Sequence, residues 1–277
     1  MPLSIEKRVY LEQLCQKFRK ELLELLYHAQ TGHPGGSLSC TEILTTLYFS
    51  IMNVDPNNPQ KMDRDRFILS KGHAAPMLYL ILAEKGFFPK DELSTFRQCG
   101  SRLQGHPCAH KLPGIDLSTG PLGLGLSAGV GMALASELSG VPYHTFVLLG
   151  DGEIQEGAVW EAAMTAAKYK PKRLTAIIDR NKVQLDGTID EIMPEENLAE
   201  RFEAFGWNVL QADGHNISQI FDAISQAKLQ EYPTVILADT VKGKGISFME
   251  GKNEWHGKAI SAEDYSQARQ ELEVNCI

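Results

Sequence analysis

The sequence contains few cysteines, and their spacing follows no metal or disulfide pattern. Five cysteines occur in 277 residues, at positions 15, 40, 99, 108 and 276, and none forms a Cys-x-x-Cys pair. An odd and scattered set of this kind disfavours both a disulfide framework and a zinc site. We therefore expect reduced thiols and a cytoplasmic location.

Long apolar stretches and an excess of basic charge are also absent. The longest apolar run, Met77–Ala83, is far shorter than the ~20 residues that a membrane span requires. The N-terminus is charged and lacks the apolar core of a signal peptide. The net charge is −8, whereas nucleic-acid-binding domains usually carry a basic face. The sequence thus favours a soluble protein that binds neither membranes nor nucleic acids.

Short apolar segments alternate with amphipathic ones along the chain. The apolar segments predict strands at Arg66–Ser70, Thr145–Leu149, Leu174–Asp179, Asn208–Ala212 and Thr234–Thr240. Helical spacing predicts helices over residues 5–30, 41–50, 75–86, 124–139, 157–169, 195–205 and 217–229, and a capping box at Ser261 opens a last helix. Fully apolar strands between helices indicate an α/β fold, a mostly parallel sheet with helices on both faces. We predict one domain over residues 1–277 with a C-terminal helical tail.

Polar residues follow two of the predicted strands. Gly150, Asp151 and Gly152 end the second strand, and Asn181 follows the third. Ligands of parallel sheets bind at the carboxyl ends of strands, so Asp151 and Asn181, with a nearby backbone carbonyl, predict a Mg²⁺ or Ca²⁺ site. A site with so little charge requires an anionic ligand such as a diphosphate. The alternative is that Asp151 only caps a helix beginning near Gly157.

Glycine adjoins an unusual number of the eight histidines. His33, His73, His106 and His215 each follow a glycine and His256 precedes one, whereas composition predicts roughly 0.7 Gly-His pairs. Several neutral imidazoles around one pocket suit a substrate rich in hydroxyl groups. The alternative is a set of ordinary, exposed loop histidines.

Glycines and lysines suggest contacts to phosphate. Residues 123–128 match G-x-G-x-x-A, but no apolar strand precedes them, so we interpret them as a loop that presents backbone groups to a ligand rather than as a dinucleotide motif. Lys71, Lys242 and Lys258 lie beside glycines or histidines and suit phosphate oxygens, unless they are solvated surface charges.

Together these segments resemble transketolase. GDGEIQEGAVWEAA followed by IIDRNKVQLDG resembles the thiamine-diphosphate motif. TGHPGGSLS, LSKGHAAPMLY, LQGHP, STGPLGLG and EWHGK match the family in order over residues 31–258. The resemblance implies the thiamin-diphosphate-binding fold but covers only the N-terminal part of a complete transketolase. We therefore expect the N-terminal, diphosphate-binding subunit of a split transketolase.

The resemblance implies roles for individual residues. It implies metal ligands at Asp151, Asn181 and the carbonyl of Val183. It implies residues near the thiamine diphosphate at Lys71, His73, Gly120, Leu122, Gly150, Gly152, Leu185, Lys242 and His256. It implies catalytic residues around the sugar hydroxyls at His33, His73, His106 and His256, and a relay acid at the subunit interface at Glu156. Gly36 departs from a serine found in some members, and Arg180 and His215 receive no role.

The resemblance also implies a reaction and a partner. The reaction is transfer of a two-carbon ketol unit from an anionic ketose to an aldose, and the partner is a chain with the pyrimidine-binding domain, with two copies of each chain. A glutamate that activates the cofactor belongs to that domain. The alternatives are an α subunit of a 2-oxo acid dehydrogenase, a deoxyxylulose-phosphate synthase fragment, a non-catalytic module, or a nicotinamide oxidoreductase. The number of histidines favours a sugar substrate.

Overall fold

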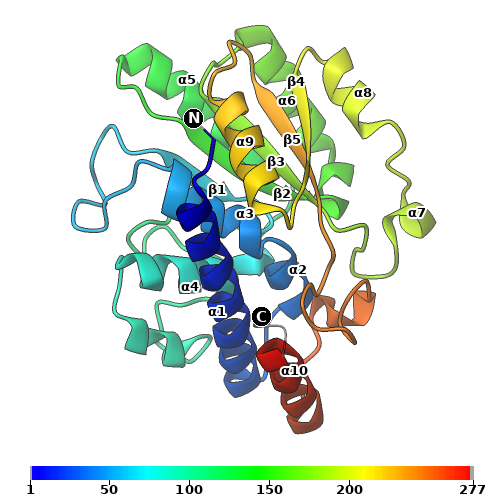
Figure 1. The fold of residues 1–277 in the computed structure, drawn as a ribbon. Helices are drawn as coiled ribbons and strands as arrows, with labels where there is room; N and C mark the ends of the chain where they lie inside the picture. Colours follow the sequence, from blue (N-terminus) through cyan, green and yellow to red (C-terminus); the bar gives the residue numbers. More distant parts are fainter. Residues whose placement is uncertain (1, 275–277) are drawn as a thin grey trace.

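A parallel sheet forms the centre of the computed structural model, which describes residues 2–274 (Figure 1). Its strands are β1 (Arg66–Leu69), β2 (Thr145–Gly150), β3 (Leu174–Arg180), β4 (Asn208–Asp213) and β5 (Thr234–Asp239). They lie in the order β1-β2-β3-β5-β4, and every neighbouring pair is parallel. The predicted α/β fold and all five predicted strands are confirmed, each strand within one residue at either end.

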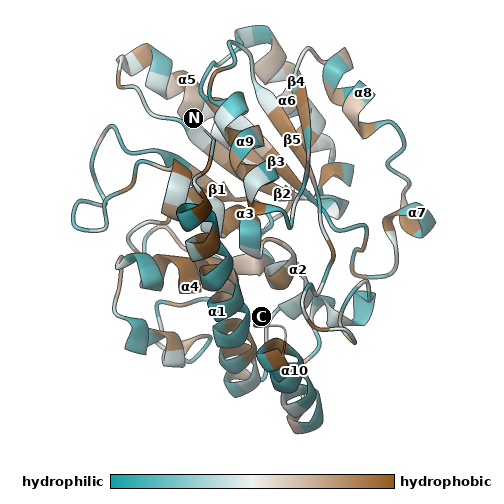
Figure 2. Ribbon diagram, in the orientation of Figure 1, coloured by the Kyte–Doolittle hydropathy of each residue, from teal (hydrophilic) through white to brown (hydrophobic). Residues whose placement is uncertain are grey.

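Helices cover both faces of the sheet because successive strand residues point to opposite sides. On one face lie α1 (Ile5–Ala29), α2 (Pro34–Ser39), α3 (Thr41–Thr46), α4 (Ala75–Lys85) and α9 (Ile217–Ala227). On the other lie α5 (Leu124–Ser139), α6 (Gly157–Tyr169) and α8 (Leu198–Ala204). In β2, Phe146 and Leu148 pack in the first layer, and Val147 and Leu149 in the second. Figure 2 shows the resulting hydrophobic strands between helices whose outer sides are hydrophilic.

Shorter elements complete the described chain. These are α7 (Ile189–Ile192), a π-helical turn at Leu47–Ile51, and 3-10 turns at Gly72–Ala74, Lys90–Thr95, Gly152–Gln155 and Asn253–His256. The predicted last helix is α10 (Ala262–Val274), which packs against α1 (Figure 1). Within residues 2–274, no helix has the length and apolar character needed to cross a bilayer. Cys276 lies outside the described residues.

Several predicted helix boundaries differ from the observed ones. The first helix ends at Ala29, one residue before the predicted end, because Gln30 adopts a left-handed conformation with φ 50° and closes the helix by its own N–H. The helix predicted over 41–50 leaves α geometry after Thr46 and continues as the π-helical turn. The helix predicted over 195–205 begins only at Leu198, since Asn197 is left-handed with φ 57°.

Two glycines bring α5 close to the sheet. A Cβ at Gly125 would lie 2.2 Å from Ser70 Oγ, and one at Gly129 would lie 2.4 Å from Val147 Cγ2. This approach fixes the loop before α5 beside the carboxyl ends of β1 and β2. The outer side of α5 is exposed, since Leu138 is 89% exposed and Leu124 is 53% exposed.

Candidate active site

A cavity of about 260 Å³ opens at the carboxyl ends of β2 and β3. Of the residues predicted to bind cofactor or metal, all except Gly120 line it. Gly120 lies against the turn that carries Lys71 and His73, since a Cβ on Gly72 would lie 3.1 Å from the Gly120 nitrogen. Gly36, which departs from the serine of some family members, also lines the cavity, and so do Glu153 and Gln184, which the sequence did not single out as site residues.

The strand ends bring Asp151 and Asn181 together, as the parallel sheet predicts. Gly150 pairs with Asp179 in the register of β2 and β3, and each polar residue follows shortly after its strand. Asp151 is 3% exposed and accepts hydrogen bonds from the N–H groups of Gly152 (2.8 Å) and Lys182. Burial, together with the charge of Asp179, raises the pKa of Asp151 to about 6.

Asp151 caps the 3-10 turn at Gly152–Gln155, whereas the N-cap of α6 is Glu156. The alternative prediction, that Asp151 caps the helix beginning near Gly157, is therefore wrong. Within residues 2–274, no group of three His, Cys, Asp or Glu side chains could hold a metal ion. The donors at this edge are one carboxylate, one amide and the Val183 carbonyl, which are oxygen ligands of the kind that Mg²⁺ and Ca²⁺ prefer.

Lys71 and Lys242 are buried at the cavity, so the alternative of solvated surface lysines is wrong for both. Lys71 is 1% exposed, pairs with Asp179 and donates to the Gly36 carbonyl (2.7 Å). Lys242 is 2% exposed, and its Nζ lies 2.9 Å from both the Val183 carbonyl and His256 Nδ1. Burial and the neighbouring Lys71 lower the pKa of Lys242 to about 8. Two buried ammonium groups therefore face one cavity.

Four of the glycine-linked histidines form one cluster. The ring centre of His33 lies 5.3 Å from that of His73, 5.4 Å from that of His256 and 6.4 Å from that of His106. Burial, followed by nearby cationic groups, lowers the pKa of His33 to about 4 and that of His256 to about 3. The pKa values of His73 and His106 are lowered for the same reason. At neutral pH these rings are uncharged, and each can donate one hydrogen bond and accept another.

One buried nitrogen of the histidine cluster has no hydrogen-bond partner among the described residues. His33 Nδ1 is buried and makes no hydrogen bond to any described residue. Because an unpaired buried polar atom is costly, this nitrogen suits a ligand that carries hydroxyl groups. The alternative of ordinary, exposed loop histidines is wrong for His33, His73 and His256, which are partly buried and whose rings lie close together. His106, the fourth member of the cluster, is exposed.

Other predicted residues lie at the rim. Leu122 is 38% exposed and Leu185 is 59% exposed, although both line the cavity. Glu156 is exposed beside Gly123, where a Cβ would lie 2.7 Å from Glu156 Cβ. An exposed apolar and acidic rim is suited to contact with another surface.

Two buried carboxylates at the cavity, Asp179 and Glu153, were not predicted as site residues. Asp179 is fully buried and accepts hydrogen bonds from Lys71, Ser39 and Thr240. Glu153 is 2% exposed and accepts from Ser70 and from the N–H groups of Gly123 (2.9 Å) and Gly150 (3.0 Å). Asp179 had a signal in the sequence, since it is an acid at the end of an otherwise apolar strand.

The structure also gives the surroundings of Gly36, which departs from the family pattern, and of Arg180 and His215, which received no role. A Cβ at Gly36 would lie 3.1 Å from His73 Nε2, so a serine there would require the imidazole to shift. Arg180 pairs with Asp239 across the β3–β5 edge at 3.3 Å. His215 lies away from the cavity and bonds to Glu42.

The sheet, the oxygen donors and the buried lysines define a domain suited to an anion and a hard cation together. Residues 12–276 match the family model described as the thiamine diphosphate binding domain of transketolase, and the chain belongs to this family. It is 45% identical to one subunit of the apulose-4-phosphate transketolase of Phocaeicola vulgatus, over 95% of this chain and 93% of that one. It is also 45% identical to a 6-deoxy-6-sulfo-D-fructose transketolase subunit of Clostridium sp., over 97% of this chain and 98% of that one.

Longer relatives show the same likeness over part of their length. Human transketolase is 39% identical over 96% of this chain and 42% of its own. The solved transketolase of Campylobacter jejuni superposes with a TM-score of 0.90 at 31% identity, over 98% of this chain and 43% of that chain. The chain thus spans under half the length of these transketolases. The predictions of a thiamin-diphosphate-binding fold, of the N-terminal subunit of a transketolase, and of a ketol-transferring enzyme are confirmed.

Proposed function

We propose that this cytoplasmic chain binds thiamine diphosphate and Mg²⁺, with Ca²⁺ as an alternative cation, and works with a separate chain that carries the pyrimidine-binding domain. The reaction is transfer of a two-carbon ketol unit from an anionic ketose to an aldose. The observation that carries the proposal is the cavity itself, where Asp151, Asn181, Lys71 and Lys242 converge with neutral histidines. The relatives that match along nearly their whole length are named as subunits, which supports a two-chain enzyme.

The residues present fit a diphosphate and its cation. Among the described residues, the ammonium of Lys242 hydrogen-bonds to a carbonyl and an imidazole, so it can accept an anion without breaking an ion pair. Asp151, Asn181 and the Val183 carbonyl would hold the cation, and Gly150 and Gly152 leave space at the strand end. When bound, thiamine diphosphate supplies a nucleophilic carbon and an electron sink for cleaving a bond beside a carbonyl.

The neutral histidines would hold the sugar. His73 and His256 line the cavity, and the rings of His33 and His106 belong to the same cluster. Uncharged imidazoles can donate to one hydroxyl and accept from another, and can hold or pass a proton. The relatives that act on apulose-4-phosphate and on a sulfonated fructose support an anionic ketose as substrate.

The partner would cover the exposed rim. Leu122, Leu124 and Met164 are 38%, 53% and 50% exposed at or near the cavity edge and along α5 and α6. Glu156 lies on the same edge, where it would join a relay between two sites. Since a glutamate of the pyrimidine-binding domain activates the cofactor in this family, the partner would supply it, in an assembly with two copies of each chain. Stable interfaces of this kind bury about 1,200–2,000 Å² or more.

Reconstitution tests the proposal. The chain is purified with the product of the neighbouring reading frame, thiamine diphosphate and Mg²⁺ are added, and ketol transfer is assayed across phosphorylated and sulfonated ketoses. We expect activity from the pair and negligible turnover from either chain alone. Asp151→Ala should abolish metal-dependent cofactor binding in calorimetry. Unchanged cofactor affinity in this variant would refute the assignment of Asp151, and an active isolated chain would refute the need for a partner.

A further inference from the structure

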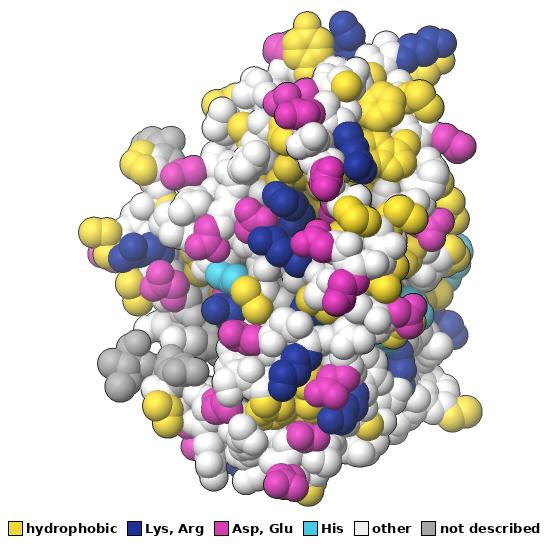
Figure 3. All heavy atoms as spheres, turned by 90° about the vertical axis from the view of Figure 1, so that its right-hand side faces the viewer, with side chains coloured by type: hydrophobic (Ala, Val, Ile, Leu, Met, Phe, Trp, Pro, Cys, Tyr) yellow, Lys and Arg dark blue, Asp and Glu magenta, His cyan; other side chains and the backbone are white. Residues whose placement is uncertain are grey.

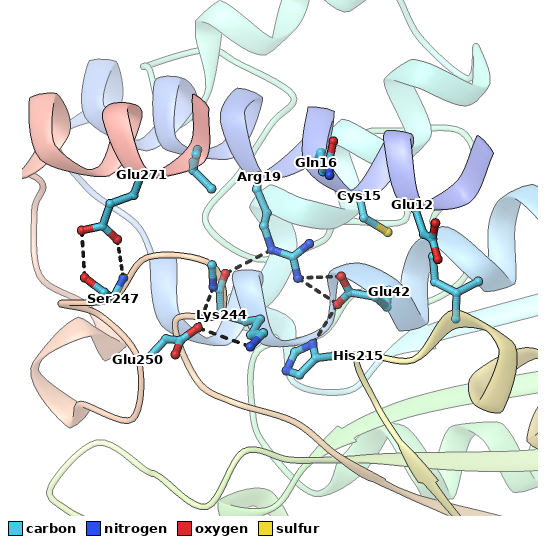
Figure 4. Close-up of a pocket in the computed structure, with 13 residues that line it drawn as sticks. Glu12, Cys15, Gln16, Arg19, Glu42, His215, Lys244, Ser247, Glu250 and Glu271 are labelled. Carbon is cyan, nitrogen blue, oxygen red and sulfur yellow. Dashed lines mark hydrogen bonds and ion pairs between the residues drawn. The ribbon is translucent and has the colours of Figure 1, made fainter. Parts of the chain in front are cut away.

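A second pocket, of about 530 Å³, lies on the α1 side of the sheet and contains a buried charged network (Figure 4). Arg19 of α1 and Glu42 of α3 are 8% and 6% exposed, and their side chains pair at 2.7 Å. His215, in the turn between β4 and α9, contacts the same carboxylate through Nδ1 at 2.9 Å. The active-site cavity uses none of these three residues.

Arg19 and His215 each bond to the backbone of one short loop. The N–H of Val241 donates to His215 Nε2 at 2.8 Å, and Arg19 Nε donates to the Lys244 carbonyl at 3.1 Å. Lys242 lies between these two anchored residues. Because His215 Nε2 accepts from Val241, Nδ1 carries the proton that goes to Glu42, so the ring is held in one orientation.

Glycine permits these contacts. A Cβ at Gly214 would lie 2.3 Å from Thr240 Cγ2, so the glycine lets the turn that carries His215 lie against the end of β5. Gly243 has φ 79°, and a Cβ there would lie 2.5 Å from the Met249 carbonyl oxygen. The Gly-His pair at 214–215 and the Lys-Gly-Lys-Gly segment thus serve one arrangement.

We propose that Arg19, Glu42 and His215 form a clamp that positions Lys242 for the diphosphate. The Glu42 carboxylate orients Arg19 and His215. Each of these two side chains then holds the loop on one side of Lys242. These are positioning residues, since none of them lines the active-site cavity. The inference rests on the proposed function, because it takes the ligand of Lys242 to be the diphosphate.

Two substitutions each cut one link to the loop while keeping Glu42 paired. In His215→Asn the amide can still donate to Glu42 but no longer reaches Val241. In Arg19→Lys the ammonium can still pair with Glu42 but cannot also reach the Lys244 carbonyl. In the complex reconstituted with its partner and Mg²⁺, we expect the dissociation constant of thiamine diphosphate in calorimetry to rise roughly three- to tenfold for each. His215→Gln, which can still accept from Val241, should restore most of the affinity.

The matched control is His144→Asn. His144 is also buried, at 4% exposure, and lies at the opposite end of the sheet, where its ring hydrogen-bonds to Thr175 and stacks on Phe146. This variant should lower the melting temperature without changing cofactor affinity. Wild-type affinity in both His215→Asn and Arg19→Lys would overturn the clamp.

A Lys242→Met background separates positioning from general stability. If the clamp acts through Lys242, His215→Asn should cause no further loss of affinity in that background. An equal loss in both backgrounds would show that the clamp does not act through Lys242.

Hydrogen exchange tests the clamp without the cofactor. In the full chain, His215→Asn should speed exchange of the Val241 N–H roughly tenfold or more, and His144→Asn should leave it unchanged. Failure of the wild-type complex to bind thiamine diphosphate would instead refute the proposed function, whereas unchanged exchange in His215→Asn would refute the clamp alone.

Discussion

Lys71 and Lys242 reach the same cavity from two differently built regions. Lys71 follows β1 and forms a buried ion pair with Asp179, at the end of β3. Lys242 follows β5, and among the described residues its ammonium hydrogen-bonds to a carbonyl and to an uncharged imidazole, each at 2.9 Å. Burial alone would lower the pKa of both lysines, but Asp179 raises that of Lys71 above its usual value while that of Lys242 falls to about 8. The first charge is already balanced by the protein, and the second is available to a ligand.

The surroundings of the two lysines differ in the same way. The carboxylate of Asp179 also accepts from Ser39 and Thr240, so the Lys71 region is a closed network within the core. The loop that carries Lys242 is held through the backbone of Val241 and Lys244. The ammonium of Lys242 is therefore not paired with a carboxylate of that network. Acidic and basic side chains mix over the face on the right of Figure 1, as Figure 3 shows. Buried, unbalanced charge thus marks the ligand-facing region.

The largest effect on stability is expected at the buried ion pair of Lys71 and Asp179. Asp179→Asn leaves Lys71 charged and buried without its partner, which should reduce the free energy of unfolding by about 3–5 kcal/mol. Urea unfolding of the cofactor-free chain measures this loss. A loss below about 1 kcal/mol would mean that Lys71 and Lys242 do not differ as we argue.

The second prediction concerns Lys242, whose burial should make the stability of the chain rise with pH. A lysine in the unfolded chain has a pKa near 10.4, so between about pH 8 and pH 10 the unfolded chain binds more protons than the folded one, and burying Lys242 becomes less unfavourable as pH rises. Below pH 8, Lys242→Met should therefore be more stable than wild type without cofactor. That advantage should shrink by about 2–3 kcal/mol up to pH 10. Parallel stability profiles of the two proteins would contradict the lowered pKa of Lys242.

A smaller effect is expected at the edge of the histidine cluster. His106→Ala removes an uncharged hydrogen-bonding group that lies 6.4 Å from His33 between ring centres. We expect the donor KM to rise or kcat to fall by roughly tenfold, with unchanged affinity for thiamine diphosphate. Steady-state kinetics and calorimetry together check this. Wild-type kinetics would remove His106 from the substrate site.

The smallest effect is expected for an exposed ion pair at the same sheet edge. Arg180 and Asp239 are 28% and 49% exposed in their side chains and lie 3.3 Å apart. Arg180→Ala should change the free energy of unfolding by less than about 1 kcal/mol, because solvent screens such pairs. Thermal unfolding checks it, and a loss as large as that of Asp179→Asn would show that burial is not what separates these pairs.

Much of the site could be predicted because its residues follow regular elements. Asp151 and Asn181 end neighbouring parallel strands, and a parallel sheet brings such ends together whatever the details of packing. The four histidines of the cluster were detectable because each adjoins a glycine in the sequence. Glu42 was not, since it lies within a helical segment among apolar neighbours and its partners are 23 and 173 residues away.

The sequence by itself determined the five strands, their parallel α/β arrangement and the oxygen donors at the strand ends, because periodicity and strand-end polarity are local properties of the chain. Only the tertiary structure decided that Lys71 is neutralised by Asp179 and Lys242 is not. That difference depends on the strand order β1-β2-β3-β5-β4, which brings together groups 108 residues apart. Ion-pair partners are brought together by the fold, so the spacing of charged residues along the chain does not reveal which of them pair.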